Sequence, residues 1–270
     1  MIDTSALSEI EDALRERRLD VERVEDTFNV SQGSGIMAHK AHIDPRPLLE
    51  QLSDAAPARR RQIAGYASGI KHVLLEPKRS SAGEWDFVES AGGLIPGIHV
   101  STFTTGVDAA SGSPAWTLDF EEDLQIAYII KLDRGLRVLT TAQVDRWGVS
   151  ADRITSASRS LLFHKTRNLN FEPFAAFDDV RRLQAGDGHD AARCLVVGDA
   201  FYSDIDDAFR FALPSPDHFL CVFDSTPTAL KQLKRATTEV YNDVDYPLSK
   251  RLFRFETGTP VPLDEAPHDR

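Results

Sequence analysis

The sequence contains few of the residues that mark secreted or membrane-bound proteins. Among its 270 residues there are only two cysteines, two methionines and three tryptophans. Cys194 and Cys221 both lie in apolar stretches, which predicts buried, reduced thiols and no disulfide framework. The longest apolar run, near residues 126–132, is far shorter than the roughly 20 residues that span a bilayer. The first residues are acidic and no signal-peptide pattern follows them, so we expect a soluble, cytoplasmic protein.

An excess of positive charge is also missing. The chain has 31 lysines and arginines against 42 aspartates and glutamates, a formal net charge of −11. A phosphate backbone or an anionic membrane surface would be repelled by such a chain, so we expect neither a nucleic-acid nor a membrane partner. The three tryptophans are scattered and offer no stacking platform for single-stranded nucleic acid.

Catalytic and metal-binding motifs are scarce as well. The glycines and serines of residues 31–35 lack the G-x-S-x-G spacing of a nucleophile elbow and predict a hairpin turn. His39 and His42 would face opposite sides of a strand, which argues against a shared metal ion. The arginine run at residues 59–61 is typical of a solvated charge cluster. The acidic stretches 204–207 and 242–245 lack the spacing of a calcium loop.

Apolar periodicity predicts both helices and strands. Helical stripes run from Leu7 to Leu14, capped by Ser5, and over residues 63–74, and further helices are expected after Ser150 and after Thr226. The expected strands cover residues 21–30, 36–43, 124–132, 136–139, 174–183, 217–223 and 251–256. Because strand pairs precede helices without regular β-α-β alternation, we predict an α+β fold with mixed or mainly antiparallel sheets and packed helices.

Residues 108–114 contain glycine, serine and proline and are predicted to form a long loop between two subdomains. The expected organisation is an N-terminal α+β subdomain over residues 1–112 and a second α+β domain over residues 113–263. Residues 264–270 are expected to form a disordered tail.

One stretch, Gly186–Arg193, combines permissive glycines with four ionisable side chains: Asp187, His189, Asp190 and Arg193. It matches the form G-x-G-x-x-A of a dinucleotide-binding turn, but its two aspartates would repel a pyrophosphate. As a metal site, Asp187, His189 and Asp190 would supply carboxylate and imidazole ligands, with further ligands from elsewhere, such as the aspartates of residues 204–207.

The same stretch has two other interpretations. Asp187 or Asp190 could act with His189 as an acid–base pair while Arg193 grips an anionic substrate. Alternatively the residues are structural: Asp190 caps a helix over residues 190–197, the preceding Asp-Gly pair makes a tight turn, and Arg193 forms a short-range ion pair with one aspartate. The structural interpretation accounts for every residue type without a ligand.

The C-terminal half, from about Leu124 to Leu263, resembles the YtpQ-like family of uncharacterised bacterial proteins, which carries a domain of unknown function. The most specific match is Gly186–Arg193, where the family motif reads roughly Asp-Gly-Tyr-Asp-Ala-Ser/Ala-Arg. His189 stands in place of the family's tyrosine, and Pro216 stands where an arginine is expected. The resemblance implies an α+β fold and a cytosolic location, and it implies no activity.

These observations favour a non-catalytic module that binds another protein or a small ligand, without a cofactor. The alternative is a metal-dependent or acid–base hydrolase-like enzyme that uses the Gly186–Arg193 turn. A third hypothesis is an immunity or stress-associated factor that sequesters a partner. The sequence leaves the ligand and the oligomeric state open.

Overall fold

The structure is a computed structural model that describes residues 3–32, 39–74, 86–132, 135–174 and 176–263. The tail at residues 264–270, the predicted turn residues 133–134 and most of the expected 31–35 turn lie outside the described residues. The chain forms two compact units. The first unit comprises residues 1–95 and 99–158, and the second comprises residues 159–270 together with 96–98.

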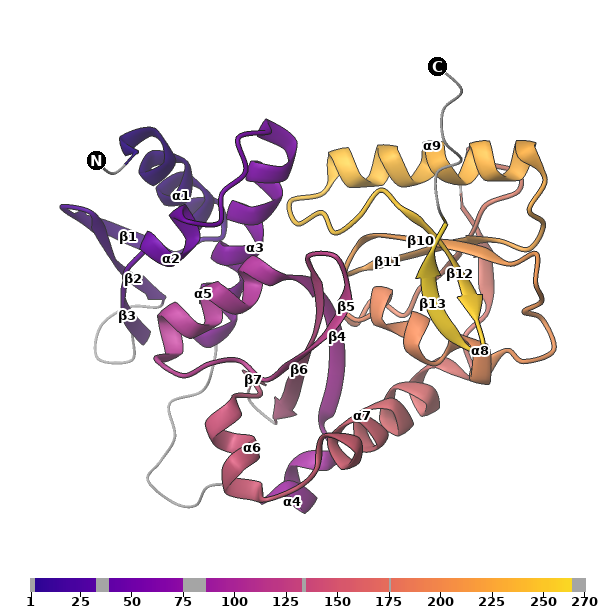
Figure 1. Cartoon of the computed structure of the whole chain (residues 1–270), viewed down its shortest axis with the longest axis horizontal. Coiled ribbons are helices and arrows are strands. Elements are labelled where there is room, and N and C mark those ends of the chain that lie inside the picture. Colours follow the sequence, from indigo (N-terminus) through magenta and orange to yellow (C-terminus); the bar gives the residue numbers. More distant parts are fainter. Residues whose placement is uncertain (1–2, 33–38, 75–85, 133–134, 175, 264–270) are drawn as a thin grey trace. The chain divides into compact units, whose positions relative to one another are not determined.

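The fold class is α+β, as the sequence predicts. The first unit holds a three-stranded sheet of order β1-β2-β3 and a second sheet in which β6 pairs with β4, β5 and β7. The pairings β1–β2, β2–β3, β5–β6 and β6–β7 are antiparallel. Two elements, β4 and α7, belong only in part to this unit. The elements from the first helix to α7, in chain order, are α1 (Thr4–Glu16), β1 (Asp20–Val24), β2 (Thr27–Gln32), β3 (His39–Ile43), α2 (Arg46–Leu49), α3 (Ala56–Leu74), α4 (Phe87–Ala91), β4 (Leu94–Val100), α5 (Ser101–Ser111), β5 (Thr117–Glu121), β6 (Leu124–Leu132), β7 (Gly135–Val138), α6 (Thr141–Trp147) and α7 (Ala151–Thr166). They run from indigo to rose in Figure 1.

Helix α1 begins before its predicted cap. The carboxylate of Asp3 accepts a hydrogen bond from the backbone N–H of Ser5, so Asp3 is the N-cap and Ser5 lies inside the helix. The predicted stripe is correct: Leu7 and Leu14 are fully buried in one core cluster with Phe28 of β2. The expected strand over residues 21–30 is a hairpin of two strands, β1 and β2.

Helix α5 corrects the predicted loop at residues 108–114. The helix continues to Ser111 and ends at Gly112, which has a left-handed φ of 68°. Its serine, threonine and glycine content gives it low helix propensity, so packing stabilises it. The backbones of α3 and α5 approach closely at glycines. A Cβ on Gly69 would lie 2.0 Å from the Phe103 carbonyl oxygen, and one on Gly106 would lie 2.1 Å from the Tyr66 carbonyl oxygen.

The second unit contains one six-stranded sheet of order β13-β12-β10-β11-β9-β8. The predicted strand over residues 174–183 is much shorter than expected, because only its last three residues pair. A further strand, not among the predicted ones, forms at Phe171–Pro173. Strand β13 has no counterpart among the sequence predictions. The elements are β8 (Phe171–Pro173), β9 (Arg181–Leu183), the 3-10 helix η2 (Ala191–Leu195), α8 (Val197–Ala200), β10 (Arg210–Ser215), β11 (His218–Val222), α9 (Pro227–Asp243), β12 (Leu252–Glu256) and β13 (Thr259–Pro262).

The six-stranded sheet is covered on both faces. Helix α9, in yellow in Figure 1, begins at its predicted cap Thr226 and packs Leu233 against Ala212 and Leu220 of the sheet. The other face carries stacked phenylalanines, and the ring centroids of Phe211 and Phe219 are 5.2 Å apart. The segment that contains η2 contacts strands β10 and β11. Both cysteines are buried free thiols, and burial raises the pKa of each.

Prolines occupy the outer edge of this sheet. The backbone N–H of Leu263 donates to the carbonyl of Leu252. Backbone groups alternate in direction along an antiparallel strand. The backbone N–H and C=O of Val261 therefore also point toward β12, whereas the backbone groups of Pro260 and Pro262 point away from it. Because proline has no backbone N–H, the outer edge of β13 has no hydrogen-bond donor for an added strand at these two positions.

The boundary between the two compact units falls inside α7, between residues 158 and 159. The boundary predicted from the sequence is at residues 112/113. Residues 113–158 belong with the N-terminal part because β5 and β6 are in the same sheet as β4.

Candidate functional site

The Gly186–Arg193 turn joins β9 to η2 in the second unit. Gly186 and Gly188 have φ angles of 68° and 79°, in the left-handed region where residues with a Cβ are strained. The turn is also fixed to its neighbour, the β10–β11 hairpin, because the backbone N–H of Ala191 donates to the carbonyl of Pro216 over 2.9 Å. Two glycines and one long-range hydrogen bond therefore determine the path of the chain here.

Arg193 lies at the centre of the turn and is fully buried. Its Nη1 and Nη2 atoms donate to the two carboxylate oxygens of Asp187, each over 3.0 Å. Nη1 also donates to Oδ1 of Asp190 over 2.9 Å. Asp190 is fully buried too, whereas the Asp187 side chain is 27% exposed. We call Asp187, Asp190 and Arg193 the buried ion triad.

The two carboxylates of the buried ion triad have opposite pKa shifts. Burial raises the pKa of Asp190, and the backbone N–H of Ala185 and the charge of Arg193 offset this only in part. Burial would also raise the pKa of Asp187, but the hydrogen bonds and charge of Arg193 bring it below its ordinary value. Asp187 is thus the stronger ionic partner of Arg193.

The cap predicted at Asp190 is wrong in its detail. Asp190 occupies the N-cap position of η2 but makes no side-chain cap bond; its Oδ1 instead accepts the backbone N–H of Ala185, on the strand side of the turn. The helix expected over residues 190–197 is a 3-10 helix followed by the four-residue α8. Arg193 pairs with both aspartates, where one was expected. The Asp190 carboxylate therefore closes the turn by bonding to the Arg193 guanidinium and to the backbone of Ala185.

His189, the fourth candidate residue, is 8% exposed and contributes its charge to the lowered pKa of Asp187. Within the described residues, no group of three or more His, Cys, Asp or Glu side chains is placed to hold a metal ion. Asp206, one of the further ligands considered, instead accepts the backbone N–H of Ala208. No cofactor site was expected from the sequence.

A serine–histidine contact that the sequence analysis missed lies in the adjacent hairpin. Ser215 Oγ and His218 Nδ1 are 2.7 Å apart, across the tight turn between β10 and β11. Ser215 is only 3% exposed, so its hydroxyl is poorly placed to meet a substrate. Burial lowers the pKa of His218, which Asp217 partly offsets. The Ser-x-x-His spacing flanking a Pro-Asp turn was the signal available in the sequence.

The arginine run at residues 59–61 contacts acidic side chains of the first unit. Arg59 bonds to Glu9 over 2.9 Å, and Arg61 pairs with Asp123. His39 and His42 lie on opposite faces of β3, because residues alternate along a strand.

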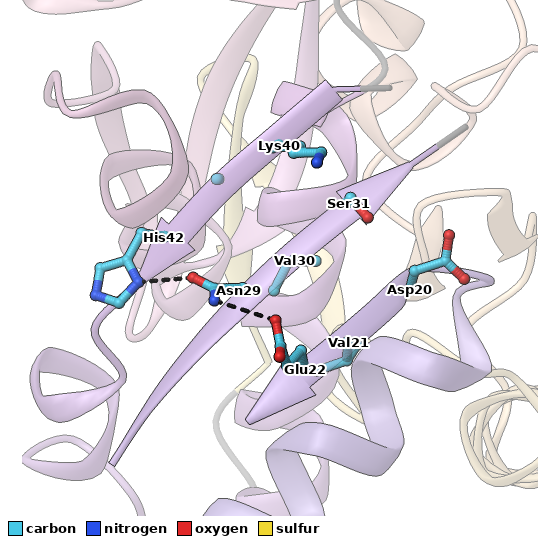
Figure 2. Close-up of a pocket in the computed structure, with 9 residues that line it drawn as sticks. Asp20, Val21, Glu22, Asn29, Val30, Ser31, Lys40 and His42 are labelled. Atoms are coloured by element: carbon cyan, nitrogen blue, oxygen red, sulfur yellow. Dashed lines mark hydrogen bonds between the residues drawn. The ribbon is translucent and has the colours of Figure 1, made fainter. Parts of the chain in front are cut away.

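The outer face of the three-stranded sheet contains a hollow of about 470 Å³. Figure 2 shows Asn29 of β2 lying between His42 of β3 and Glu22 of β1, bonded to both. Oδ1 of Asn29 lies 3.0 Å from Nδ1 of His42, and its Nδ2 donates to Glu22 over 3.4 Å. The hydrogen-bonded chain thus crosses all three strands. The hollow is lined by Asp20, Val21, Glu22, Asn29, Val30, Ser31, Lys40, Ala41 and His42.

A larger hollow of about 740 Å³ lies in the second unit, between α9 and the strand pair β12–β13. We call it the α9 groove. Its apolar lining comes from both sides of the groove, and three of its residues are cationic and exposed. The lining residues are Leu230, Lys234, Thr238, Lys250, Arg251, Leu252, Pro262 and Leu263.

Comparisons with known proteins give no match: no family model, no curated protein and no solved structure matches this chain. None of the helices within the described ranges is long and apolar enough to cross a membrane.

Proposed function

We propose that this chain is a non-catalytic binding protein and that its ligand is a small amphipathic anion held in the α9 groove. The observation that carries the proposal is the combination, in one hollow, of an apolar floor and three cationic side chains. Ligand pockets typically have volumes of roughly 300–1,000 Å³ and are mostly apolar with a few placed polar groups. The α9 groove, at about 740 Å³, lies within that range.

The floor of the groove suits an apolar tail. Leu230 of α9 and Leu252 of β12 are partly buried and pack against the core cluster between α9 and the sheet. Leu263 and Pro262 extend this apolar surface along β13. Covering such surface contributes about 25 cal/mol for each Å² removed from water. An alkyl or aryl tail therefore has a favourable place to bind.

The cations suit a carboxylate or phosphate head. Lys234, Lys250 and Arg251 line the groove in a chain whose net charge is −11. Lys250 is held in place, because its Nζ lies 4.6 Å from the centroid of the Tyr241 ring and donates to Asn242 over 3.0 Å. A charge-assisted hydrogen bond to such a group is about twice as strong as a neutral one.

The edge prolines favour a small molecule over a peptide. A peptide that binds a sheet edge adds a strand through main-chain hydrogen bonds. Pro260 and Pro262 face outward on β13 and have no N–H to offer. Recognition in the groove then depends on side chains, which is the mode by which a compact amphipathic ligand binds.

The hydrolase-like alternative has weaker support. It requires Asp187, His189, Asp190 and Arg193 to meet a substrate, whereas Asp190 and Arg193 are fully buried and bonded to each other. Membership of the YtpQ-like family stays a prediction.

Thermal denaturation with matched ligands tests the proposal. Decanoate and decyl phosphate below their micelle concentrations should raise the Tm, whereas 1-decanol, which has the same tail and no charge, should not. At 100 times its dissociation constant a ligand adds about 2.7 kcal/mol of stability. In the double variant Lys234→Gln/Lys250→Gln the shift should fall sharply. Lys165→Gln, an exposed lysine on α7, is the matched control. An equal shift with decanol, or an undiminished shift in the double variant, would refute the proposal.

A further inference from the structure

The outer face of the three-stranded sheet carries two rows of polar side chains that differ in their bonding. Residues directly opposite each other on paired antiparallel strands share a face. Glu22, Asn29 and His42 are one such row, and hydrogen bonds join all three side chains (Figure 2). The Asn29 amide, bonded on both sides, fixes this row as one wall of the hollow.

The second row, Asp20, Ser31 and Lys40, lies two residues along the same strands. None of these three side chains has a hydrogen-bond or ion-pair partner within the described part of the chain. All three line the hollow of about 470 Å³ (Figure 2). Their groups are therefore available to a ligand, and they place a carboxylate, a hydroxyl and an ammonium in order across the sheet.

Strand spacing sets the distance between the two charges. Neighbouring strands lie about 4.8 Å apart, so the backbones of β1 and β3 are separated by about 10 Å. Asp20 on β1 and Lys40 on β3 are the charged ends of the row, with Ser31 of β2 between them. A molecule seated over Ser31 would meet a carboxylate at one end and an ammonium at the other.

We propose that this hollow binds a small zwitterion of the amino-acid or dipeptide type. The ligand's ammonium donates to Asp20, its carboxylate accepts from Lys40, and the Ser31 hydroxyl bonds to the polar groups between them. Charge complementarity selects this class. A simple anion would be repelled by Asp20 and Glu22, and a simple cation would be repelled by Lys40. A zwitterion satisfies both ends.

Isothermal titration of the full chain with glycylglycine tests this site. The capped peptides N-acetylglycylglycine and glycylglycinamide each lack one of the two charges. Each should bind about tenfold more weakly than glycylglycine, the loss expected for one charge-assisted hydrogen bond. If glycylglycine gives no binding at millimolar concentration, or if both capped peptides bind equally well, the proposal is overturned.

Two variants locate the binding. Asp20→Asn should abolish the preference for the free amine, and Lys40→Gln should abolish the preference for the free carboxylate. Asp12→Asn on α1 and Lys165→Gln on α7 are matched controls at exposed positions and should retain both preferences. Unchanged preferences in Asp20→Asn and Lys40→Gln would place the peptide elsewhere and refute the site. Because Lys250 lies in the other unit, Lys250→Gln should leave this binding intact even if the α9 groove binds no anion.

Discussion

The buried ion triad and the α9 groove both gather charge within the second unit, but they use it in opposite ways. In the triad, one guanidinium with no exposed surface donates to two carboxylates that belong to the same turn. In the groove, three cations lie exposed around partly buried leucines. The density of ionisable residues along a sequence therefore does not identify a binding site. What matters is whether the fold buries the charges or leaves them exposed.

The energetics of the two regions differ for the same reason. Removing charged groups from water is costly, and partners must be well placed to offset that cost. The triad meets most of this requirement through two-point bonding between Arg193 and Asp187 and a backbone donor, Ala185, for Asp190. Among the described residues, Oδ2 of Asp190 and Nε of Arg193 have no hydrogen-bond partner. The groove lysines, Lys234 and Lys250, keep their contact with water, so their own contacts contribute little to stability.

Arg193→Met should give the largest effect and tests the triad most directly. Removing the guanidinium leaves two carboxylates at least partly buried without their cation. We expect a loss of about 3–5 kcal/mol in the free energy of unfolding, measured by urea denaturation. Arg60→Met, at an exposed position on α3, should change it by less than about 0.5 kcal/mol. If Arg193→Met were as stable as the unmodified chain, the triad would not be structural.

Two glycines differ in the space that is available to an added Cβ in the same way as the triad and the groove differ in burial. Gly69→Ala places a Cβ 2.0 Å from the Phe103 carbonyl oxygen, where only a shift of the α3 or α5 backbone relieves the contact. We expect a loss of about 1–3 kcal/mol. Gly198→Ala in α8 is the matched control, because nothing lies within 4 Å of its added Cβ. It should be neutral or stabilising by up to about 1 kcal/mol in the same denaturation assay.

Within the triad, the two aspartates should respond to pH with opposite signs. Because burial raises the pKa of Asp190 above its ordinary value of 3.8, the folded state binds that proton more tightly than the unfolded state. Its contribution to stability is present below pH 3.8 and is lost as the pH rises through the folded-state pKa. The pKa of Asp187 is lowered, so its contribution is present above pH 3.8 and is lost as the pH falls through the folded-state pKa.

Urea denaturation at several pH values measures these contributions. The difference in free energy of unfolding between the unmodified chain and Asp190→Asn should decrease as the pH rises above 3.8. For Asp187→Asn the same difference should decrease as the pH falls below 3.8. Parallel profiles for the two variants would contradict the assignment of Asp187 as the stronger partner of Arg193.

Lys250→Gln should give the smallest effect on stability and separates ligand binding from folding. The variant loses an exposed cation–π contact with Tyr241 and one hydrogen bond to Asn242. We expect a change of about 0.5–1 kcal/mol or less in the free energy of unfolding. In the same variant the Tm shift caused by decanoate should decrease. A large destabilisation without any change in ligand response would place Lys250 among the structural residues.

Local pattern predicted the elements with strong periodicity. The apolar stripes of α1 and α3 and the cap at Thr226 are defined by residues close together in the sequence. The sequence alone was therefore sufficient to predict them. Helix α5 was missed because its serines, threonines and glycine have low helix propensity. It forms because α3 supplies a matching surface of small residues, and no local pattern contains that information.

The candidate site shows the same division. The residue types at Gly186–Arg193 predicted a tight turn with an ion pair, and the structure contains both. The pairing of Arg193 with two aspartates and the bond from Ala185 to Asp190 depend on the chain's path between β9 and η2. Neither the α9 groove nor the sheet hollow was predicted. Each forms from residues that are distant in sequence, such as Leu230 and Leu263.

Composition and periodicity over a few residues were enough to establish the α+β class, the low cysteine content and the acidic charge. Which charges are buried and which are exposed depended on tertiary packing. Arg193 and Lys250 are both cations with apolar residues within two positions in the sequence. Arg193 became buried because η2 packs on the sheet, whereas Lys250 remained exposed beside α9. Burial depends on contacts between distant segments, and those contacts exist only in the folded chain.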